Sequence, residues 1–229
     1  MWGTGHDVRP VGARRPLAAP SPDRPGRLGR SALNQGALDI SRGRDGADET
    51  CRLLLSLDRF ADREAGTTLD TLYYYWDALR GDGRTMPLAK DFRPGHVFGP
   101  GFMNWVHAVE TAVDDPANFV MRDHGNNGAV PYTVRMADRR IADYPRRLHA
   151  RGCMREYQMC RLLRRPLYHE IDHITAGVAR HYTRILLPLA DERGAVVRLA
   201  YAIRLLDPPF RMFADRADAE VDYYSLSRR

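Results

Sequence analysis

Residues 182–206, YTRILLPLADERGAVVRLAYAIRLL, contain the pattern that most constrains the fold of this chain. In its second half, apolar side chains occupy alternate positions: Val197, Leu199, Tyr201, Ile203 and Leu205. This alternation is typical of a β-strand with one buried face. A denser apolar run, 185–189, precedes it, and Gly194 between the two can take the positive φ of a hairpin turn. Because a hairpin is not stable alone in water, further strands and a covering helix are expected.

An amphipathic helix is predicted over Leu69 to Arg80. Thr67 and Asp70 have the spacing of a capping box at its start, and Gly81 is suited to end it. Apolar side chains recur at helical spacing along one face: Leu69, Leu72, Tyr73, Trp76 and Leu79. We expect that face to be buried.

A second helical segment is predicted within residues 138–165. Cys153, Tyr157 and Cys160 lie at helical spacing there, and Pro166 ends the pattern. The cysteines share a helical face, which suggests either redox sensing or ordinary buried packing of small apolar groups.

The remaining elements are predicted from shorter patterns. Strands are expected within residues 118–124, 130–136 and 167–175, whereas residues 105–113 are expected to be helical. The predicted domain organisation has four parts: a disordered basic tail rich in Arg, Pro and Gly at 1–48, a short helical flank at 49–66, the main domain at 67–207 and a helical C-terminal tail at 208–229.

Composition excludes several classes of function. The chain has 229 residues and a net charge of +6, but arginines within 1–48 and at the C-terminus supply much of the excess, and Lys90 is the sole lysine. Such a basic tail binds polyanions without sequence preference, so no specific nucleic-acid site is expected. No apolar run approaches the roughly 20 residues of a membrane-spanning helix, so no membrane partner is expected.

Cysteine usage and the N-terminus indicate the compartment. The three cysteines, Cys51, Cys153 and Cys160, form no CxxC pair, which favours a reducing environment over a disulfide framework. The opening MWGTGHDVRP lacks the apolar core of a secretory signal, so a cytoplasmic location is expected.

Residues 169–173, HEIDH, match the HExxH motif of zinc proteases. On a helix, His169 and His173 would share one ion and Glu170 would activate a water molecule. On a strand the two histidines would stand about 13 Å apart, too far for one metal. The β-branched Ile171 and the bracketing Pro166 favour a strand, so a zinc-dependent hydrolase is the alternative interpretation.

Two stretches resemble a known family. TLYYYWDALRGDGRTMPLAKDFRP resembles the opening "YW..LR..G..LP.R.D..P" of the bacterial PAS-fold proteins of PAS family 5, and ILLPLADERGAVVRLAYAI resembles the family's closing hairpin, "LLLPL..DG..V". The resemblance covers residues 68–206. It implies an α+β fold with a five-stranded antiparallel sheet and helices on one side, here preceded by an N-terminal helical cap. It brings no catalytic residues.

A ligand pocket is expected between the second helical segment and the concave side of the sheet. Five side chains are predicted to line it as ligand-binding residues: Tyr157, Arg161, Leu186, Leu199 and Tyr201. The Arg- and Tyr-rich run 139–165 would suit an anionic ligand or an acidic partner, or would simply form a solvated helical face. Some PAS domains hold haem through a histidine, for which His149 is the candidate, although a lone histidine is more often solvent-facing.

These observations predict a non-enzymatic sensory or protein-interaction module of bacterial signalling. The expected partners are a small-molecule ligand, a signalling protein and a second copy of the chain, with the flanks 49–60 and 210–224 as docking surfaces. A third interpretation, a scaffold without a pocket, predicts a core filled by Tyr and Leu side chains.

Overall fold

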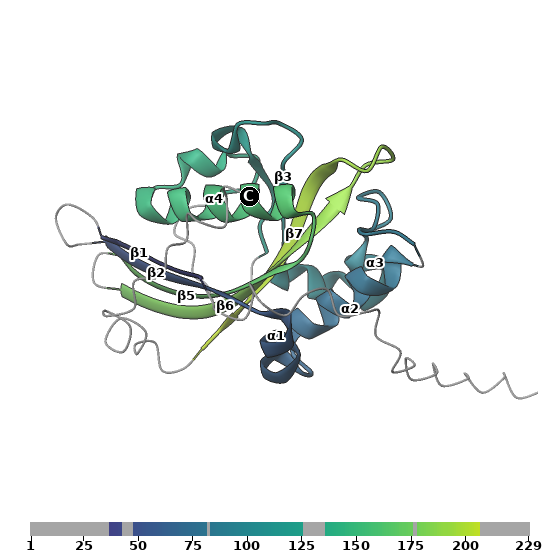
Figure 1. Ribbon diagram of the computed structural model, residues 1–229, viewed down its shortest axis with the longest axis horizontal. Coiled ribbons are helices and arrows are strands. Elements are labelled where there is room, and N and C mark those ends of the chain that lie inside the picture. Colours follow the sequence, from purple (N-terminus) through teal and green to yellow (C-terminus); the bar gives the residue numbers. More distant parts are fainter. Residues whose placement is uncertain (1–36, 43–47, 82, 126–135, 176–177, 207–229) are drawn as a thin grey trace, which may run out of the picture. The chain divides into compact units, whose positions relative to one another are not determined.

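A seven-stranded antiparallel sheet forms the centre of the protein, with strand order β1-β2-β5-β6-β7-β3-β4 (Figure 1). The computed structural model describes residues 37–42, 48–81, 83–125, 136–175 and 178–206, all within the second of two units, Leu33–Arg229. The strands are β1 (Ala37–Arg42), β2 (Asp48–Leu55), β3 (Val106–Glu110), β4 (Val120–Asp123), β5 (Leu167–Thr175), β6 (Val178–Ala190) and β7 (Val196–Leu205).

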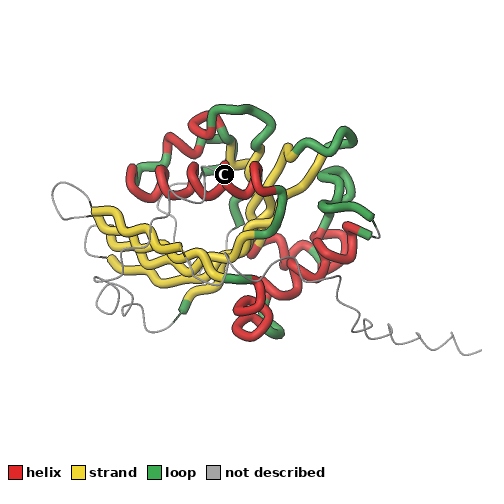
Figure 2. The backbone as a smooth tube through the Cα atoms, in the orientation of Figure 1, coloured by secondary structure: helices red, strands yellow, loops and turns green. Residues whose placement is uncertain are grey.

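Helices cover both faces of this sheet. The α-helices are α1 (Leu57–Glu64), α2 (Thr68–Arg80), α3 (Pro94–Phe98) and α4 (Arg147–Leu163), and the short 3-10 helices are η1 (Pro100–Trp105), η2 (Pro116–Asn118) and η3 (Ile141–Asp143). Helix α4 lies above the sheet and α1 and α2 lie below it (Figures 1 and 2). Helices on one side only were expected, so this part of the prediction is wrong.

The predicted hairpin is confirmed as β6 and β7. Tyr182 pairs with Leu205 at one end, and Gly194 takes a φ of +81° in the turn. Both faces of β7 are buried, however, because Ala200 and Ala202 lie on the lower face, against which α2 packs, while Tyr201 lies on the upper face beneath α4. The alternation in this part of β7 is therefore one of large and small side chains, and it does not mark one face as exposed.

The helix predicted over Leu69 to Arg80 is confirmed as α2. The Thr67 side chain accepts a hydrogen bond from the Asp70 backbone N–H, and Asp70 accepts one from the backbone N–H of Gly66. The indole Nε1–H of Trp76 donates to the Pro188 carbonyl at 2.8 Å, which fixes α2 against the lower face of β6.

Three other expectations need correction. The sheet has seven strands rather than five because β1 and β2 extend it beyond β5. Residues 49–55, expected within the helical flank 49–66, lie in β2, and of that flank Leu57–Glu64 are helical. Residues 106–110, expected to be helical, form β3, whose neighbour β7 supplies a full register of partners. Tertiary strand pairing outweighs the weak helical pattern of these short segments.

Other expectations fall outside the described residues. These are most of the basic tail at 1–48, the strand predicted over 130–136 apart from its last residue, and the C-terminal tail at 208–229. Within 1–48, residues 37–42 form β1 and are therefore not part of a disordered tail.

Candidate functional site

The contact between α4 and the upper face of the sheet contains buried charged side chains. Arg52 on β2, Glu156 on α4 and Arg184 on β6 are each at most 2 % exposed. Side chains alternate between the two faces of a strand, so Arg52 and Arg184 share the upper face with Tyr182 and Leu186. Full burial of three charges requires that they bind one another.

Glu156 links the two arginines. Its Oε2 accepts hydrogen bonds from Nη1 of Arg52, at 2.6 Å, and from Nη2 of Arg184. Burial alone would raise the pKa of the Glu156 carboxyl, but Arg184 and Arg52 outweigh this effect and hold the pKa well below its usual range. All three groups are therefore charged at neutral pH.

His149 and Cys153 lie one turn apart on α4, and both contact the same charged cluster. Nη2 of Arg52 lies 3.0 Å from Nδ1 of His149, and an arginine can only donate, so Nδ1 is the acceptor and the proton lies on Nε2. Nε2 lies 3.4 Å from the sulfur of Cys153. Burial, followed by the charge of Arg52, holds the pKa of His149 well below its usual range, so its ring is neutral.

Strand β5 contributes His169 and His173. His173 stacks on His149, with ring centroids 4.9 Å apart. His169 is fully buried, and neither ring nitrogen has a hydrogen-bond partner among the described residues. Its Nε2 lies 3.9 Å from Oε1 of Glu156, which is too long for a direct hydrogen bond, and that oxygen also has no hydrogen-bond partner within the described part of the chain. Burial lowers the pKa of His169 to about 3.

Aromatic rings line the side of the cluster that faces β7. The guanidinium carbon of Arg184 lies 5.4 Å from the ring centroid of Tyr157 and 5.9 Å from that of Tyr201. His107 on β3 stacks on Tyr201 at 4.6 Å. These contacts stabilise a cation that is out of reach of water.

The structure brings together four of the five predicted ligand-binding residues. Tyr157, Leu186, Leu199 and Tyr201 are buried on the face of the sheet that α4 covers. Arg161 lies apart from them, because its guanidinium binds the exposed Asp114 at 2.8 Å. The predicted site thus included the aromatic wall and omitted Arg52, Glu156 and Arg184. One sequence signal could have found Arg184, which occupies the same alternate positions as the apolar Tyr182 and Leu186.

The HEIDH segment lies in the middle of β5, as the β-branched residues favoured. His169 and His173 face α4, whereas Glu170 faces the opposite side and binds Arg63 at 2.6 Å and His181 at 2.9 Å. The helix that the zinc-hydrolase alternative requires is therefore not formed. Among the described residues, no group of three or more His, Cys, Asp or Glu side chains is placed to hold a metal ion.

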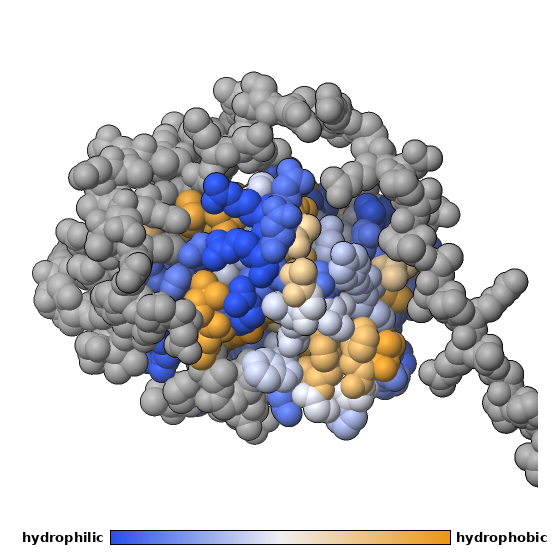
Figure 3. All heavy atoms as spheres, turned by 90° about the horizontal axis from the view of Figure 1, so that it is seen from below, coloured by the Kyte–Doolittle hydropathy of each residue, from blue (hydrophilic) through white to orange (hydrophobic). Residues whose placement is uncertain are grey.

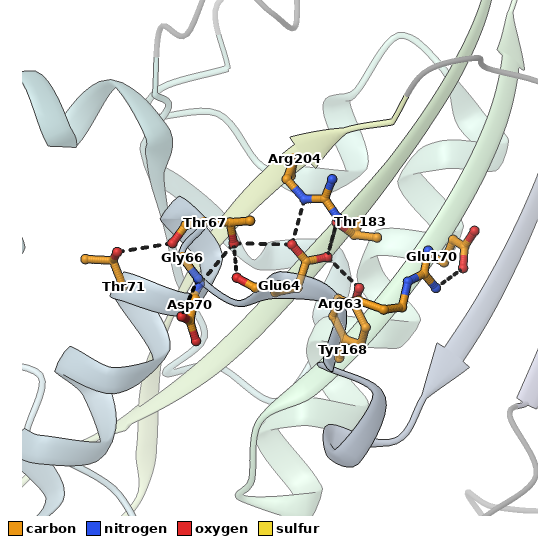
Figure 4. A network of polar contacts seen from close by, with 10 residues as sticks. All are labelled: Arg63, Glu64, Gly66, Thr67, Asp70, Thr71, Tyr168, Glu170, Thr183 and Arg204. Carbon is orange, nitrogen blue, oxygen red and sulfur yellow. Dashed lines mark hydrogen bonds and ion pairs between the residues drawn. The ribbon is translucent and has the colours of Figure 1, made fainter. Parts of the chain in front are cut away.

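A second buried carboxylate lies below the sheet (Figure 4). Glu64, at the end of α1, accepts hydrogen bonds from the Tyr168 hydroxyl at 2.5 Å, from Thr183 at 2.8 Å and from Nε of Arg204 at 2.6 Å. Burial would raise the pKa of the Glu64 carboxyl, but these donors hold it below its usual range. The network connects the α1–α2 corner to β5, β6 and β7.

Comparison with models of known protein families, with curated proteins and with solved structures gives no significant match. Function must therefore be inferred from the geometry itself. In the described part of the chain, no helix has the length and apolar character needed to cross a membrane.

Proposed function

We propose that the protein is a PAS-like sensory module that binds a small polar molecule between α4 and the sheet. The observation that carries this proposal is the buried cluster of Arg52, Glu156, Arg184 and His169, in which several polar atoms have no hydrogen-bond partner among the described residues. Its signal would pass to a partner protein, and it would act in the cytoplasm of a bacterium.

The energetics of burial favour a functional role for this cluster. Replacing buried ion pairs by apolar residues of similar volume is often neutral or stabilising, so stability alone does not explain them. A buried polar atom without a partner costs about 1–3 kcal/mol and calls for a specific explanation. A small molecule with both donor and acceptor groups, bound beside His169 Nε2 and Glu156 Oε1, which lie 3.9 Å apart, would satisfy both atoms.

The resemblance to PAS family 5 supports the same proposal. The five strands from β3 to β7 are mutually antiparallel neighbours, and α4, between β4 and β5 in the chain, packs on one face of them. This arrangement has the strand number and the covering helix that the resemblance implies. Strands β1 and β2 would then be additions to the PAS-like part.

Docking of a partner protein is the second role of the proposed module. The expected docking flank at 49–60 is largely part of the sheet, and 210–224 lies outside the described residues. Exposed apolar side chains are found instead on α2 and α3, where Tyr74 and Val97 are each about 60 % exposed. Seen from below, the described surface shows hydrophobic patches bordered by hydrophilic residues (Figure 3), as expected of a transient contact surface.

Native mass spectrometry of the full chain tests the proposal. The wild-type protein is expected to carry a small non-covalent mass, or to acquire one from a small-molecule extract of bacterial cells. His169→Phe, which removes both ring nitrogens beside Glu156, should abolish this binding, whereas His96→Phe on the exposed side of α3 should not. A wild-type protein that stays bare in both preparations would rule out the ligand-binding proposal.

A further inference from the structure

A pocket with a volume of about 490 Å³ lies where three segments meet. These segments are the connector that follows α2, the C-terminal end of α4 and the turn between β6 and β7. The charged residues that line it are Arg84, Lys90, Arg164, Asp191 and Glu192, and we call it the hairpin pocket. Its volume is that of a small-molecule site, and none of these residues belongs to the cluster beneath α4.

Backbone hydrogen bonds fix the floor of the hairpin pocket. The Ala89 N–H donates to the Ala190 carbonyl at 2.8 Å, and the Ala190 N–H donates to the Pro87 carbonyl at 2.9 Å. Met86 and Ala190 are each 3 % exposed and supply an apolar base. The connector and the turn therefore form one fixed surface rather than two independent loops.

The two carboxylates of the hairpin pocket already have partners. Oδ1 of Asp191 accepts hydrogen bonds from the backbone N–H groups of Arg193, at 2.9 Å, and Ala195, at 2.8 Å. Oε1 of Glu192 binds Nζ of Lys90 at 2.6 Å. These acids therefore stabilise the turn and its contact with the connector, and the ion pair with Glu192 compensates the charge of Lys90.

The two arginines of the hairpin pocket have no carboxylate partner among the described residues. Arg164 donates from Nη2 to the Gly194 carbonyl at 2.8 Å, which holds its guanidinium against the turn. Asp82, two residues before Arg84, lies outside the described residues and is not included in this balance. The uncompensated charge of the described pocket is therefore positive. Each guanidinium presents a planar fork of N–H groups, which matches a carboxylate or a phosphate.

The backbone of Arg164 supports a role for its side chain. At the end of α4 this residue takes a φ of 55° and a ψ of 35°. Glycine adopts this left-handed conformation more readily than any residue with a Cβ and is the usual residue at such helix ends. The backbone alone would therefore favour glycine, whereas the arginine places its guanidinium at the turn.

We propose that the hairpin pocket binds a small organic anion, whose carboxylate or phosphate group lies between Arg84 and Arg164 and whose apolar part rests on Met86. The site goes beyond the proposed function, because it lies apart from the cluster beneath α4 and uses other residues. Both arginines are exposed, so binding should weaken as the ionic strength rises.

Nuclear magnetic resonance titration of the full ¹⁵N-labelled chain tests the inference, with benzoate and phenyl phosphate as anionic probes and benzyl alcohol as the neutral probe. At least one anion should shift the amide signals of Thr85, Arg164 and Gly194 in a saturable way, and benzyl alcohol should not. The inference is wrong if neither anion saturates below about 10 mM, or if benzyl alcohol binds equally well. Shifts centred on Glu156 and His169 would place the anion beneath α4 and would also overturn it.

Variants separate recognition of the anion from loss of folding. Arg164→Gly removes the side chain at a position where the backbone favours glycine, so the fold should persist while the affinity falls about 5-fold or more. Arg84→Gln should have a similar effect. Arg161→Gln, which removes an arginine of α4 that binds Asp114 outside the pocket, should leave the affinity unchanged. Wild-type affinity in both Arg84→Gln and Arg164→Gly would overturn the inference.

Discussion

Oε2 of Glu156 accepts a hydrogen bond at 2.6 Å from Nη1 of Arg52, a residue 104 positions earlier in the chain. The contact joins the centre of α4 to β2, a strand outside the five neighbouring strands β3 to β7. Both side chains are buried, so the bond connects the helix that covers the proposed site to the strand next to the β1 edge of the sheet. A movement of the Glu156 side chain would therefore displace both α4 and β2.

The Glu156→Gln variant is expected to be strongly destabilised. Removing the carboxylate leaves two buried arginines without their common partner, which costs about 3–5 kcal/mol of the free energy of unfolding. Urea unfolding followed by circular dichroism measures this loss. The triple variant Arg52→Met, Glu156→Leu and Arg184→Met should recover most of it, since apolar groups then replace the whole ionic cluster. A loss below about 1 kcal/mol for Glu156→Gln would contradict the central role of the carboxylate.

Gly152→Ala is expected to destabilise the protein, although alanine is more favourable than glycine in a helix by about 1 kcal/mol. A Cβ at this position would lie 2.3 Å from Nε of Arg52, which its bonds to Glu156 and His149 hold in place. We expect a net loss of about 2 kcal/mol from the displaced arginine. Arg151→Ala, an exposed change in the same turn, serves as the control in thermal unfolding. Equal or higher stability of Gly152→Ala would show that Arg52 is free to move.

Glu64→Gln tests the network below the sheet. Arg204, Tyr168 and Thr183 would lose a charged acceptor, which is expected to cost about 2–4 kcal/mol. Asp62→Asn, an exposed change on α1, should have almost no effect. Hydrogen exchange should show increased opening of the α1–α2 corner in Glu64→Gln. Unchanged protection there would mean that the network does not hold the corner to the sheet.

Stability should fall as the pH falls below the ordinary pKa of histidine. Burial lowers the folded-state pKa of His107 and of His169 to about 3, while the unfolded chain has ordinary values near 6.5. Between these values the unfolded state binds more protons, so the stabilisation is complete above the unfolded pKa and is lost as the pH decreases. Each of the two histidines should lower the free energy of unfolding by about 1.4 kcal/mol when the pH falls from about 7.5 to about 5.5.

Urea unfolding of His169→Gln at the two pH values measures this dependence. The variant should show a smaller loss of stability between them, by the contribution of one histidine. An unchanged difference would indicate that His169 is protonated in the folded chain. The comparison does not depend on the absolute stability of the variant, because each protein is its own reference.

Short sequence patterns were sufficient to predict the elements that depend on residues close together in the chain. The hairpin of β6 and β7, the capping of α2 by Thr67 and the strand character of the HEIDH segment all follow from nearest-neighbour chemistry. Strands β2 and β3 were not predicted, because each is short and depends on pairing with a strand far away in the chain: β2 pairs with β5, and β3 with β7.

The sequence by itself thus determined the α+β class, the central hairpin and the buried aromatic wall of Tyr157 and Tyr201, since apolar periodicity and turn residues act locally. Only the tertiary structure decided that Arg52 and Arg184 meet at Glu156, between α4 and the sheet. A buried charge is tolerated only where its partners converge, and these partners come from three elements that are distant in the chain. Alternation with Tyr182 and Leu186 marks Arg184 as facing inward, but no local pattern identifies its partners, so the candidate site appears only once the sheet has formed.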